Sequence, residues 1–168
     1  MPWLTPDART EQVEAARDLV LRRLDRCPAP RAALASLLES KEVAQDVADE
    51  VLDRLEAVGL IDDAAYAATL ARTRFAEKGA ARRAIAEELR LKGLGEEHIT
   101  AALDQIDGAD ERAAALALAR KKLASTRGLA GPVRRRRALA HLGRKGYSQA
   151  TAADAVATAL AEEDAEDG

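Results

Sequence analysis

One segment of the chain, between Gly59 and Gly93, contains the clearest structural signals. It begins with Gly59-Leu60-Ile61-Asp62-Asp63-Ala64-Ala65-Tyr66 and ends with Leu89-Arg90-Leu91-Lys92-Gly93. Glycine often ends helices and aspartate often caps their first turn, so Asp62 or Asp63 is predicted to begin a helix that stops at Gly79. A second, shorter helix is predicted to stop at Gly93. Basic residues surround the junction between the two helices: Arg72, Arg74, Lys78, Arg82 and Arg83.

The same helical unit recurs on both sides of this segment. The motif Lys41-Glu42-Val43 is followed 51 residues later by Lys92-Gly93-Leu94 and a further 53 residues later by Lys145-Gly146-Tyr147. A period of about fifty residues with three helices per unit is typical of a tandem repeat. Equivalent apolar positions are filled by Leu38, Leu89 and Leu142 and by Leu52, Leu103 and Val156.

We therefore predict an all-α fold of three tandem three-helix repeats that form an elongated, curved array. Residues 1–10 are an N-terminal extension, residues 11–60, 61–108 and 109–160 are the repeats, and residues 161–168 are an acidic tail that we expect to be disordered. Thr5 is expected to cap the first helix with Pro6 in its first turn. Gly108 is expected to close the second repeat, and Ser148 to cap the last helix.

The composition agrees with a helical core. Hydrophobic residues make up 48% of the chain but aromatic residues only 2%, so alanine, leucine and valine supply most of the apolar surface. A core of this kind favours closely packed helices over a sheet, because strands depend on β-branched and aromatic side chains.

Several classes of protein are not supported by the sequence. Cys27 is the single cysteine, so no intrachain disulfide can form, which fits a reducing compartment. The first residues lack the basic start and apolar stretch of a signal peptide, and no apolar run is long enough to cross a bilayer. We expect a soluble cytoplasmic protein.

The sequence also gives little support to an enzyme. His98 and His141 are isolated on predicted helices, without a second ligand at metal-binding spacing. Gly93-Leu94-Gly95 lacks the rest of a phosphate-binding loop and follows no strand. We expect no catalytic residues, no metal and no cofactor.

Charge is distributed unevenly along the chain, although the net charge is only −3. Residues 110–147 contain eleven basic side chains against two acidic ones, a net charge of +9, whereas residues 39–63 have a net charge of −7 from nine acidic and two basic side chains. The acidic face within residues 46–56 is expected to be solvated. Arginine outnumbers lysine in the basic segment and suits bidentate contact with phosphate or carboxylate, so we interpret this segment as a binding surface.

The order and spacing of these motifs resemble those of the RecX family of bacterial recombination regulators, over about residues 15–160. The resemblance depends on Gly59-Leu60-Ile61-Asp62-Asp63 with Tyr66-Ala67, and on Lys78-Gly79, Glu88-Leu89 and Lys92-Gly93. Arg74 and Ile85 also match, as do Arg120-Lys121-Lys122-Leu123 and Leu142-Gly143-Arg144-Lys145-Gly146-Tyr147-Ser148. The first repeat departs most, because Lys41-Glu42-Val43 lacks the expected glycine.

The resemblance implies a non-enzymatic protein that binds the RecA recombinase, and we expect the protein to be a monomer. Members of the family lie along the groove of the RecA–DNA filament, limit its growth, and lower its ATP hydrolysis and strand exchange in homologous recombination, DNA repair and the SOS response. Direct contact with single- or double-stranded DNA is left open. The expected recognition surface consists of Arg74, Lys78, Arg82, Arg83, Lys92, Arg127, Arg134, Arg135, Arg136, Arg137, Arg144 and Lys145.

Two other interpretations stay open on sequence alone. The first is a direct DNA-binding protein made of tandem helix-turn-helix-like modules, although the helix after each turn is poor in base-reading arginine and asparagine. The second is a helical scaffold with no connection to DNA.

Overall fold

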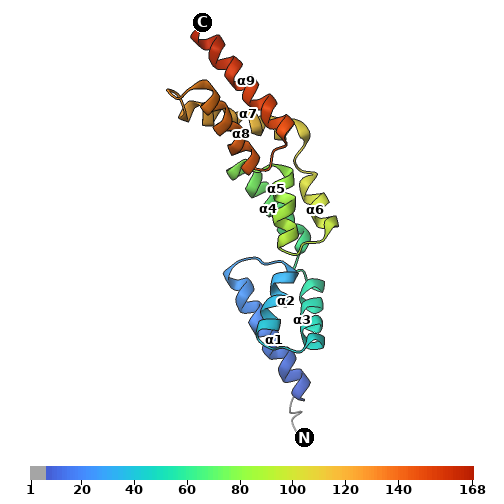
Figure 1. Ribbon diagram of the computed structural model, residues 1–168. Coiled ribbons are helices and arrows are strands. Elements are labelled where there is room, and N and C mark those ends of the chain that lie inside the picture. The colour runs from blue at the N-terminus through green and yellow to red at the C-terminus, as the bar shows by residue number, and fades with distance from the viewer. Residues whose placement is uncertain (1–6) are drawn as a thin grey trace. The chain divides into compact units, whose positions relative to one another are not determined.

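All regular structure between residues 7 and 168, the part of the chain that the computed structural model describes, is helical (Figure 1). The predicted all-α class is confirmed, and the helices follow one another in three successive sets of three. The first set is α1 (Ala8–Arg26), α2 (Arg31–Ser40) and α3 (Gln45–Ala57). The second is α4 (Asp63–Lys78), α5 (Arg82–Leu91) and α6 (Glu96–Leu103), and the third is α7 (Gly108–Ser125), α8 (Gly131–Arg144) and α9 (Gln149–Asp167).

The chain forms two compact units. The first contains the chain up to Ala67 together with Leu89–Ile99, and the second contains Ala68–Glu88 together with Thr100–Gly168. Each of the helices α4, α5 and α6 therefore contributes residues to both units. No helix within residues 7–168 has the length and hydropathy needed to cross a membrane.

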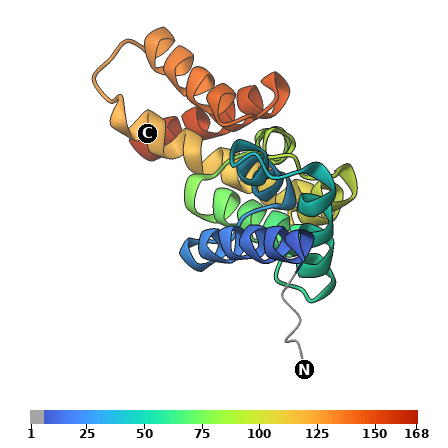
Figure 2. The same cartoon turned by 90° about the horizontal axis from the view of Figure 1, so that it is seen from below.

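The first unit is built on the apolar faces of α1, α2 and α3, which pack against one another (Figure 2). α3 shows why these faces meet, because its buried residues recur every three or four positions, the period of a helix. Leu38 of α2 and Leu52 of α3 are both buried, as the repeat pattern predicts. The buried cluster consists of Val13, Ala16, Val20, Ala29, Leu34, Leu38, Val47, Ala48, Val51, Leu52, Leu55 and Ile61.

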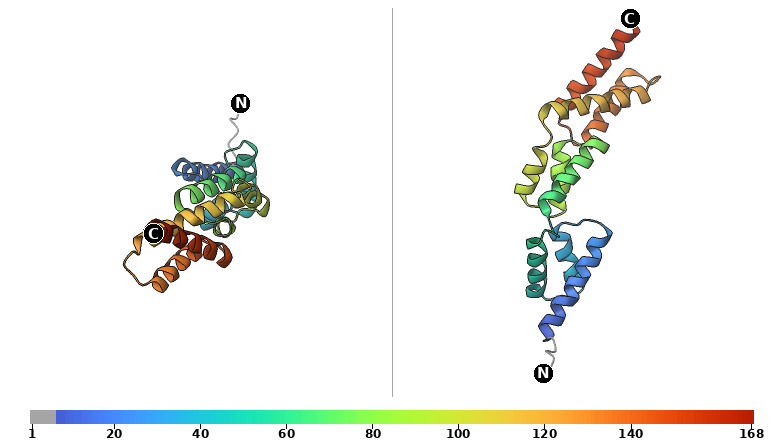
Figure 3. Two further views of the ribbon diagram at one scale, coloured as in Figure 1. Left: turned by 90° about the horizontal axis from the view of Figure 1, so that it is seen from above. Right: turned by 180° about the vertical axis from the view of Figure 1, so that it is seen from behind.

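The second unit has a core made largely of alanine, in which α7, α8 and α9 pack against one another (Figure 3). Small side chains allow the helices to approach closely, and Leu142 and Val156 fill the equivalent repeat positions with no exposed surface. Tyr147 is also buried, and its hydroxyl donates a hydrogen bond to the carbonyl of Gly79 at 2.8 Å. Burial raises the pKa of Tyr147 to about 12.

Two of the predicted repeat positions lie on helices of the second set, Leu89 on α5 and Leu103 on α6. Leu89 is fully buried as expected, but Leu103 is only half-buried, because Ala102 takes the inward position at the end of α6. α6 ends at Leu103, and Ile106 is buried after the helix has stopped.

Most predicted helix caps are found where the sequence places them. The side chain of Asp62 accepts a hydrogen bond from the Ala65 backbone N–H at 2.9 Å, and that of Ser148 accepts one from the Thr151 N–H at 3.1 Å. Gly108 differs from expectation, since it is the first residue of α7 and Asp107 is its N-cap. An N-cap aspartate leaves the next position free for almost any residue, glycine included.

At the N-terminus, Thr5 and Pro6 lie outside the described residues. Within them, α1 begins at Ala8 and Asp7 is the N-cap, with its carboxylate accepting a hydrogen bond from the Thr10 N–H at 2.7 Å. Hydrogen bonding to this backbone N–H lowers the pKa of Asp7.

The acidic end of the chain is helical, so the expectation of a disordered tail at residues 161–168 is not met. α9 continues to Asp167, and two of its acidic residues have basic partners on other helices. Glu162 accepts hydrogen bonds from Arg120 of α7 at 2.7 Å, and Glu163 accepts one from Arg134 of α8 at 2.8 Å. Hydrogen bonding to Arg120 lowers the pKa of Glu162.

The glycine in the repeated Lys-Gly motif is required by a close approach between helices. Gly146 has a φ of +95°, and a Cβ there would lie 2.5 Å from the Ala84 Cβ of α5. Gly93 has a φ of +82°, and a Cβ there would lie 2.5 Å from the Ala32 Cβ of α2. Both distances are far below van der Waals contact, so no other residue fits without moving the neighbouring helix.

The missing glycine of the first repeat has the same explanation. Glu42 occupies the equivalent position and also adopts a positive φ, of 58°. Its side chain is exposed, because no earlier repeat packs over this turn in the described chain. The backbone conformation is therefore common to all three turns, and the requirement for glycine arises only where another helix lies against it.

Acidic residues of α4 and α7 also cap the short helices of earlier repeats. The Asp63 carboxylate accepts a hydrogen bond from the Arg31 backbone N–H at 2.9 Å, and that of Glu111 accepts one from the Arg82 N–H at 2.9 Å. Asp62 and Asp63 thus have separate tasks, because Asp62 caps its own helix and Asp63 caps α2. The sequence pattern had indicated either residue as the cap of the same helix.

We predict that Gly146→Ala lowers the free energy of unfolding by ~2–4 kcal/mol, because it combines the cost of a positive φ with overpacking against Ala84. Gly128→Ala is the matched control in the same unit, with a φ of +92° but nothing within 4 Å of its Cβ. The free energy of unfolding of the control should fall by only ~1–2 kcal/mol. Urea denaturation followed by circular dichroism measures both, and equal losses would show that the close approach does not constrain this turn.

Candidate functional site

The twelve residues of the predicted recognition surface are not all in one unit. Lys92 belongs to the first unit, and the other eleven belong to the second. We therefore treat the second unit by itself as the candidate site. Within it, the predicted residues fall into three groups: those that hold the fold together, those exposed on α8 and neighbouring turns, and those that line a groove.

Arg74 is held inside the second unit by an acidic partner. Its Nε and Nη2 atoms donate to the carboxylate of Glu88 at 2.8 Å and 2.7 Å, in the bidentate geometry that suits a guanidinium. The two side chains are only 27% and 31% exposed. This pair joins α4 to α5, so Arg74 has a role in the fold.

Arg134 and Arg82 are also engaged with the protein itself. Arg134 donates to the Leu123 carbonyl at 2.8 Å and to Glu163 at 2.8 Å, and its side chain is 15% exposed. Arg82 is half-buried, and its backbone N–H is capped by Glu111. The Nε atoms of both arginines are buried without a hydrogen-bond partner among the described residues. Neither side chain presents its full guanidinium to a ligand.

The remaining arginines of the predicted surface are exposed. Among the described residues, no carboxylate lies within ion-pair distance of Arg83, Arg127 or Arg144. The same is true of three consecutive residues on α8, which we call the α8 arginine cluster: Arg135, Arg136 and Arg137. α8 turns only Ala138 and Leu142 fully inward, so the cluster covers a broad part of its outer surface.

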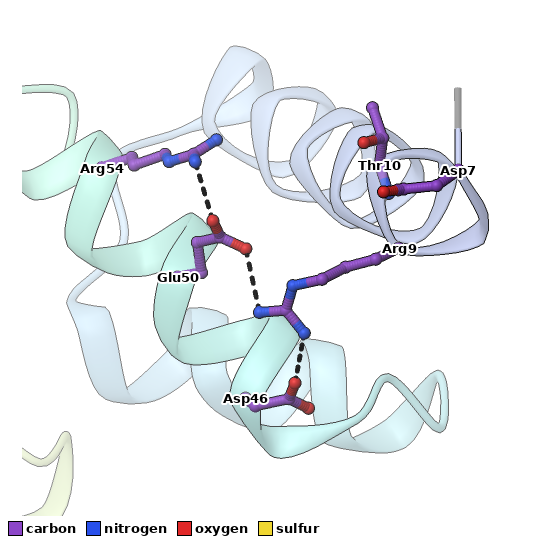
Figure 4. A network of polar contacts seen from close by, with 6 residues as sticks. All are labelled: Asp7, Arg9, Thr10, Asp46, Glu50 and Arg54. Carbon is purple, nitrogen blue, oxygen red and sulfur yellow. Dashed lines mark hydrogen bonds and ion pairs between the residues drawn. The ribbon is translucent and has the colours of Figure 1, made fainter. Parts of the chain in front are cut away.

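In the first unit, by contrast, arginines neutralise the acidic face of α3. Arg9 of α1 pairs with Asp46 and Glu50, and Glu50 also accepts a hydrogen bond from Arg54 at 2.7 Å (Figure 4). Hydrogen bonding to Arg9 lowers the pKa of Asp46. Arg31 pairs in the same way with two further residues of α3, Asp53 and Glu56.

The expectation that this acidic face is simply solvated is therefore only partly met. Four of its five acidic residues have arginine partners, and the fifth, Asp49, accepts a hydrogen bond from Gln45 at 2.9 Å. The charge of residues 39–63 is thus offset by arginines from other parts of the same unit.

Lys78 and Lys145 line a groove of about 630 Å³ together with two lysines that were not selected from the sequence, Lys121 and Lys122. The groove lies between the end of α4, the middle and end of α7 and the end of α8. Phe75 and His141 also line it, and partial burial together with the nearby lysines lowers the pKa of His141. The run Arg120-Lys121-Lys122-Leu123 was the signal in the sequence that could have identified these lysines.

No group of three or more His, Cys, Asp or Glu residues within residues 7–168 is arranged to hold a metal ion. His98 lies beside Glu97 at 3.7 Å, and Asp62 and Asp63 are occupied as helix caps. The arrangement can bind an anionic or acidic partner, but it does not assemble a nucleophile with a base.

Comparison with known proteins finds similar sequences over most of the chain. A sequence profile of the second three-helix domain of RecX matches residues 62–103, and one of the third three-helix domain of RecX matches residues 110–156. "Regulatory protein RecX" of Thermobifida fusca is 44% identical over 79% of this chain and 72% of the relative. "Regulatory protein RecX" of Mycobacterium marinum is 44% identical over 96% of this chain and 92% of the relative.

Solved structures are similar as well. "Crystal structure of regulatory protein RecX" has a TM-score of 0.75 and 27% identity, and the match covers 86% of this chain and 71% of that chain. "Crystal structure of RecX from Lactobacillus salivarius" has a TM-score of 0.79 at 19% identity and covers 89% and 97% of the two chains, which supports the fold alone.

We predict that Glu163→Gln destabilises the protein by ~1–2 kcal/mol, because it leaves the largely buried Arg134 without its charged partner. Glu162→Gln is the matched control, since Glu162 and Arg120 are 40% and 54% exposed, and its loss should stay below ~0.5 kcal/mol. Urea denaturation gives both values. If Glu162→Gln lowers the free energy of unfolding as much as Glu163→Gln does, burial does not determine how much each ion pair stabilises the protein.

Proposed function

We propose, because this chain belongs to the RecX family of regulatory proteins, that it binds the RecA–DNA filament and limits filament growth, ATP hydrolysis and strand exchange. The RecX family is one of regulators and not of enzymes, and no reaction is needed for this activity. A protein that binds one state of a filament more tightly than another shifts the assembly equilibrium by that difference in affinity alone.

The observation that carries this proposal is the α8 arginine cluster. Arg135, Arg136 and Arg137 are exposed, and no carboxylate of the described chain is paired with them. Exposed guanidinium groups suit an acidic or phosphorylated partner, because each can donate two parallel hydrogen bonds to a carboxylate or phosphate. Such a partner would gain bidentate hydrogen bonds without breaking an internal ion pair.

Some arginines of the predicted recognition surface are less suitable as contacts, because they are already paired inside the protein. Arg74 and Arg134 already have carboxylate partners, and a ligand would have to break those pairs to reach them. We therefore centre the surface on the α8 cluster, with Arg83, Arg127 and Arg144 as further exposed contributors. The proposal keeps Lys92 as a contact of the first unit.

A helix-turn-helix interpretation is less well supported by the same structure. The helices that follow the turns are α3, α6 and α9, and base-reading helices usually carry arginine, lysine, asparagine or glutamine toward the major groove. α6 contains none of these four residue types, and α9 contains only Gln149. In α3, Gln45 donates a hydrogen bond to Asp49 and Arg54 is paired with Glu50. These helices therefore offer few groups that could read a duplex.

We predict that reversing the cluster, with Arg135→Glu, Arg136→Glu and Arg137→Glu in one variant, raises the concentration needed to inhibit the RecA ATPase on single-stranded DNA at least about tenfold. The side chains are exposed, so helicity by circular dichroism should not change.

The control reverses three exposed arginines of α1 that have no ion-pair partner among the described residues: Arg17, Arg22 and Arg26. It changes the net charge equally and should inhibit like the wild type. If the cluster variant inhibits normally, the surface is misassigned. If the wild type neither changes the ATPase rate at stoichiometric excess nor sediments with RecA filaments, the proposal fails and a helical scaffold becomes the better description.

A further inference from the structure

The groove at the end of α4 concentrates lysine to an unusual degree for this chain. The protein has six lysines against twenty arginines, and four of the six line this one groove: Lys78, Lys121, Lys122 and Lys145. No arginine lines it, and Glu77 is its only acidic residue.

These lysines have no counterion within the described chain. Among the described residues, every ion pair joins a carboxylate to an arginine, apart from the weak contact between His98 and Glu97, and none uses a lysine. The protein thus uses arginine for its internal contacts with carboxylates and leaves lysine unpaired in the groove. A lysine ammonium is a compact, mobile charge that can follow a flexible anion.

A simpler explanation is that lysines near helix ends offset the negative C-terminal dipole. Lys78 ends α4, Lys122 lies in the last turn of α7 and Lys145 caps α8, so each meets that condition. Burial lowers the pKa of His141, and the charges of Lys122, Lys145, Arg144 and Lys121 lower it further. The helix-end explanation does not account for the aromatic ring in the same groove.

The groove also contains the single phenylalanine of the chain. Phe75 is half-buried and lines the groove beside Leu118, Ala114 and Ala117. A basic groove with an aromatic ring in its wall is the arrangement that binds single-stranded nucleic acid, because the charges follow the backbone and the ring stacks on a base. The groove volume of about 630 Å³ is large enough for a small organic ligand such as a nucleotide.

We propose that this groove binds a single strand of nucleic acid, with Lys78, Lys121, Lys122 and Lys145 contacting phosphates and Phe75 stacking on an unpaired base. The lysines by themselves would also suit an acidic peptide, but an aromatic wall favours a ligand with a flat base. A duplex is disfavoured because its bases are already stacked and paired. The lining of the groove includes no residue of the α8 arginine cluster, and the proposal does not depend on the proposed action on RecA.

The first test uses the protein alone with a fluorescein-labelled twelve-residue oligothymidylate, followed by fluorescence anisotropy. The variant Lys121→Gln with Lys122→Gln should weaken binding and reduce the slope of log affinity against log salt by about 0.7 for each phosphate that the variant no longer neutralises. Phe75→Leu should weaken binding by about 5- to 100-fold through loss of stacking, with apolar volume nearly retained.

The matched control is Arg22→Gln with Lys41→Gln, which removes the same charge from exposed positions of the first unit and should bind like the wild type. Equal effects of the two double variants would overturn the proposal. So would a duplex that binds as tightly as the single strand while Phe75→Leu changes nothing, which would indicate general attraction of polyanions. A twelve-residue polyglutamate that displaces the strand at lower concentration than unlabelled oligothymidylate would assign the groove to an acidic peptide instead.

A second readout is the titration of His141 followed by nuclear magnetic resonance. The groups that face it are Lys121 and Lys122 from α7, Arg144 and Lys145 from α8, and Glu77 and Lys78 from α4. Bound phosphate offsets the positive charges, so saturating oligothymidylate should raise the pKa of His141. An unchanged pKa at saturation would place the strand elsewhere. Because RecA is absent from both experiments, their outcome is independent of the RecA ATPase result.

Discussion

The turn between the second and third helices of a repeat approaches the short helix of the preceding repeat so closely that no β-carbon fits between them. Gly146 lies over Ala84 in the second unit, and Gly93 lies over Ala32 in the first. The contact is reinforced in the second unit, where the Ala81 N–H donates to the Lys145 carbonyl at 2.8 Å and Tyr147 binds Gly79. Glycine supplies both the backbone conformation and the absent side chain, so one residue type determines how successive repeats join.

Many charged side chains already have partners inside the protein, and some of these lie where successive repeats meet. Asp63 and Glu111 cap the short helices of preceding repeats, and Arg74, Arg134 and Arg31 complete ion pairs inside their own units. Buried or half-buried arginines of this kind contribute to stability and cannot be reassigned to a ligand without cost. Within the predicted recognition surface, the exposed arginines without an ion-pair partner among the described residues are Arg83, Arg127, Arg135, Arg136, Arg137 and Arg144. Within that set of twelve residues, we use exposure and the absence of an internal partner to select the proposed contacts.

Much of the fold could be predicted from the sequence because its signals are local. The caps Asp62 and Ser148, the stops at Gly59, Gly79 and Gly93 and the buried positions Leu38, Leu89 and Leu142 depend on residues within one or two turns. The helical C-terminus was missed because its stability depends on Arg120 and Arg134, about thirty to forty residues earlier. In the candidate site, the basic segment was found, but the pairing of Arg74 with Glu88 and the gathering of four lysines around Phe75 depend on tertiary contacts.

Chemical footprinting can show whether the α8 arginine cluster contacts the RecA–DNA filament, as we propose. Phenylglyoxal modifies accessible arginines, and mass spectrometry of the digested protein reports the extent at each site with and without filaments. We predict that filaments protect Arg135, Arg136 and Arg137. Three arginines of α1 should stay as reactive as in the free protein: Arg17, Arg22 and Arg26. Equal reactivity of the cluster in the free and the filament-bound protein would contradict the proposed contact.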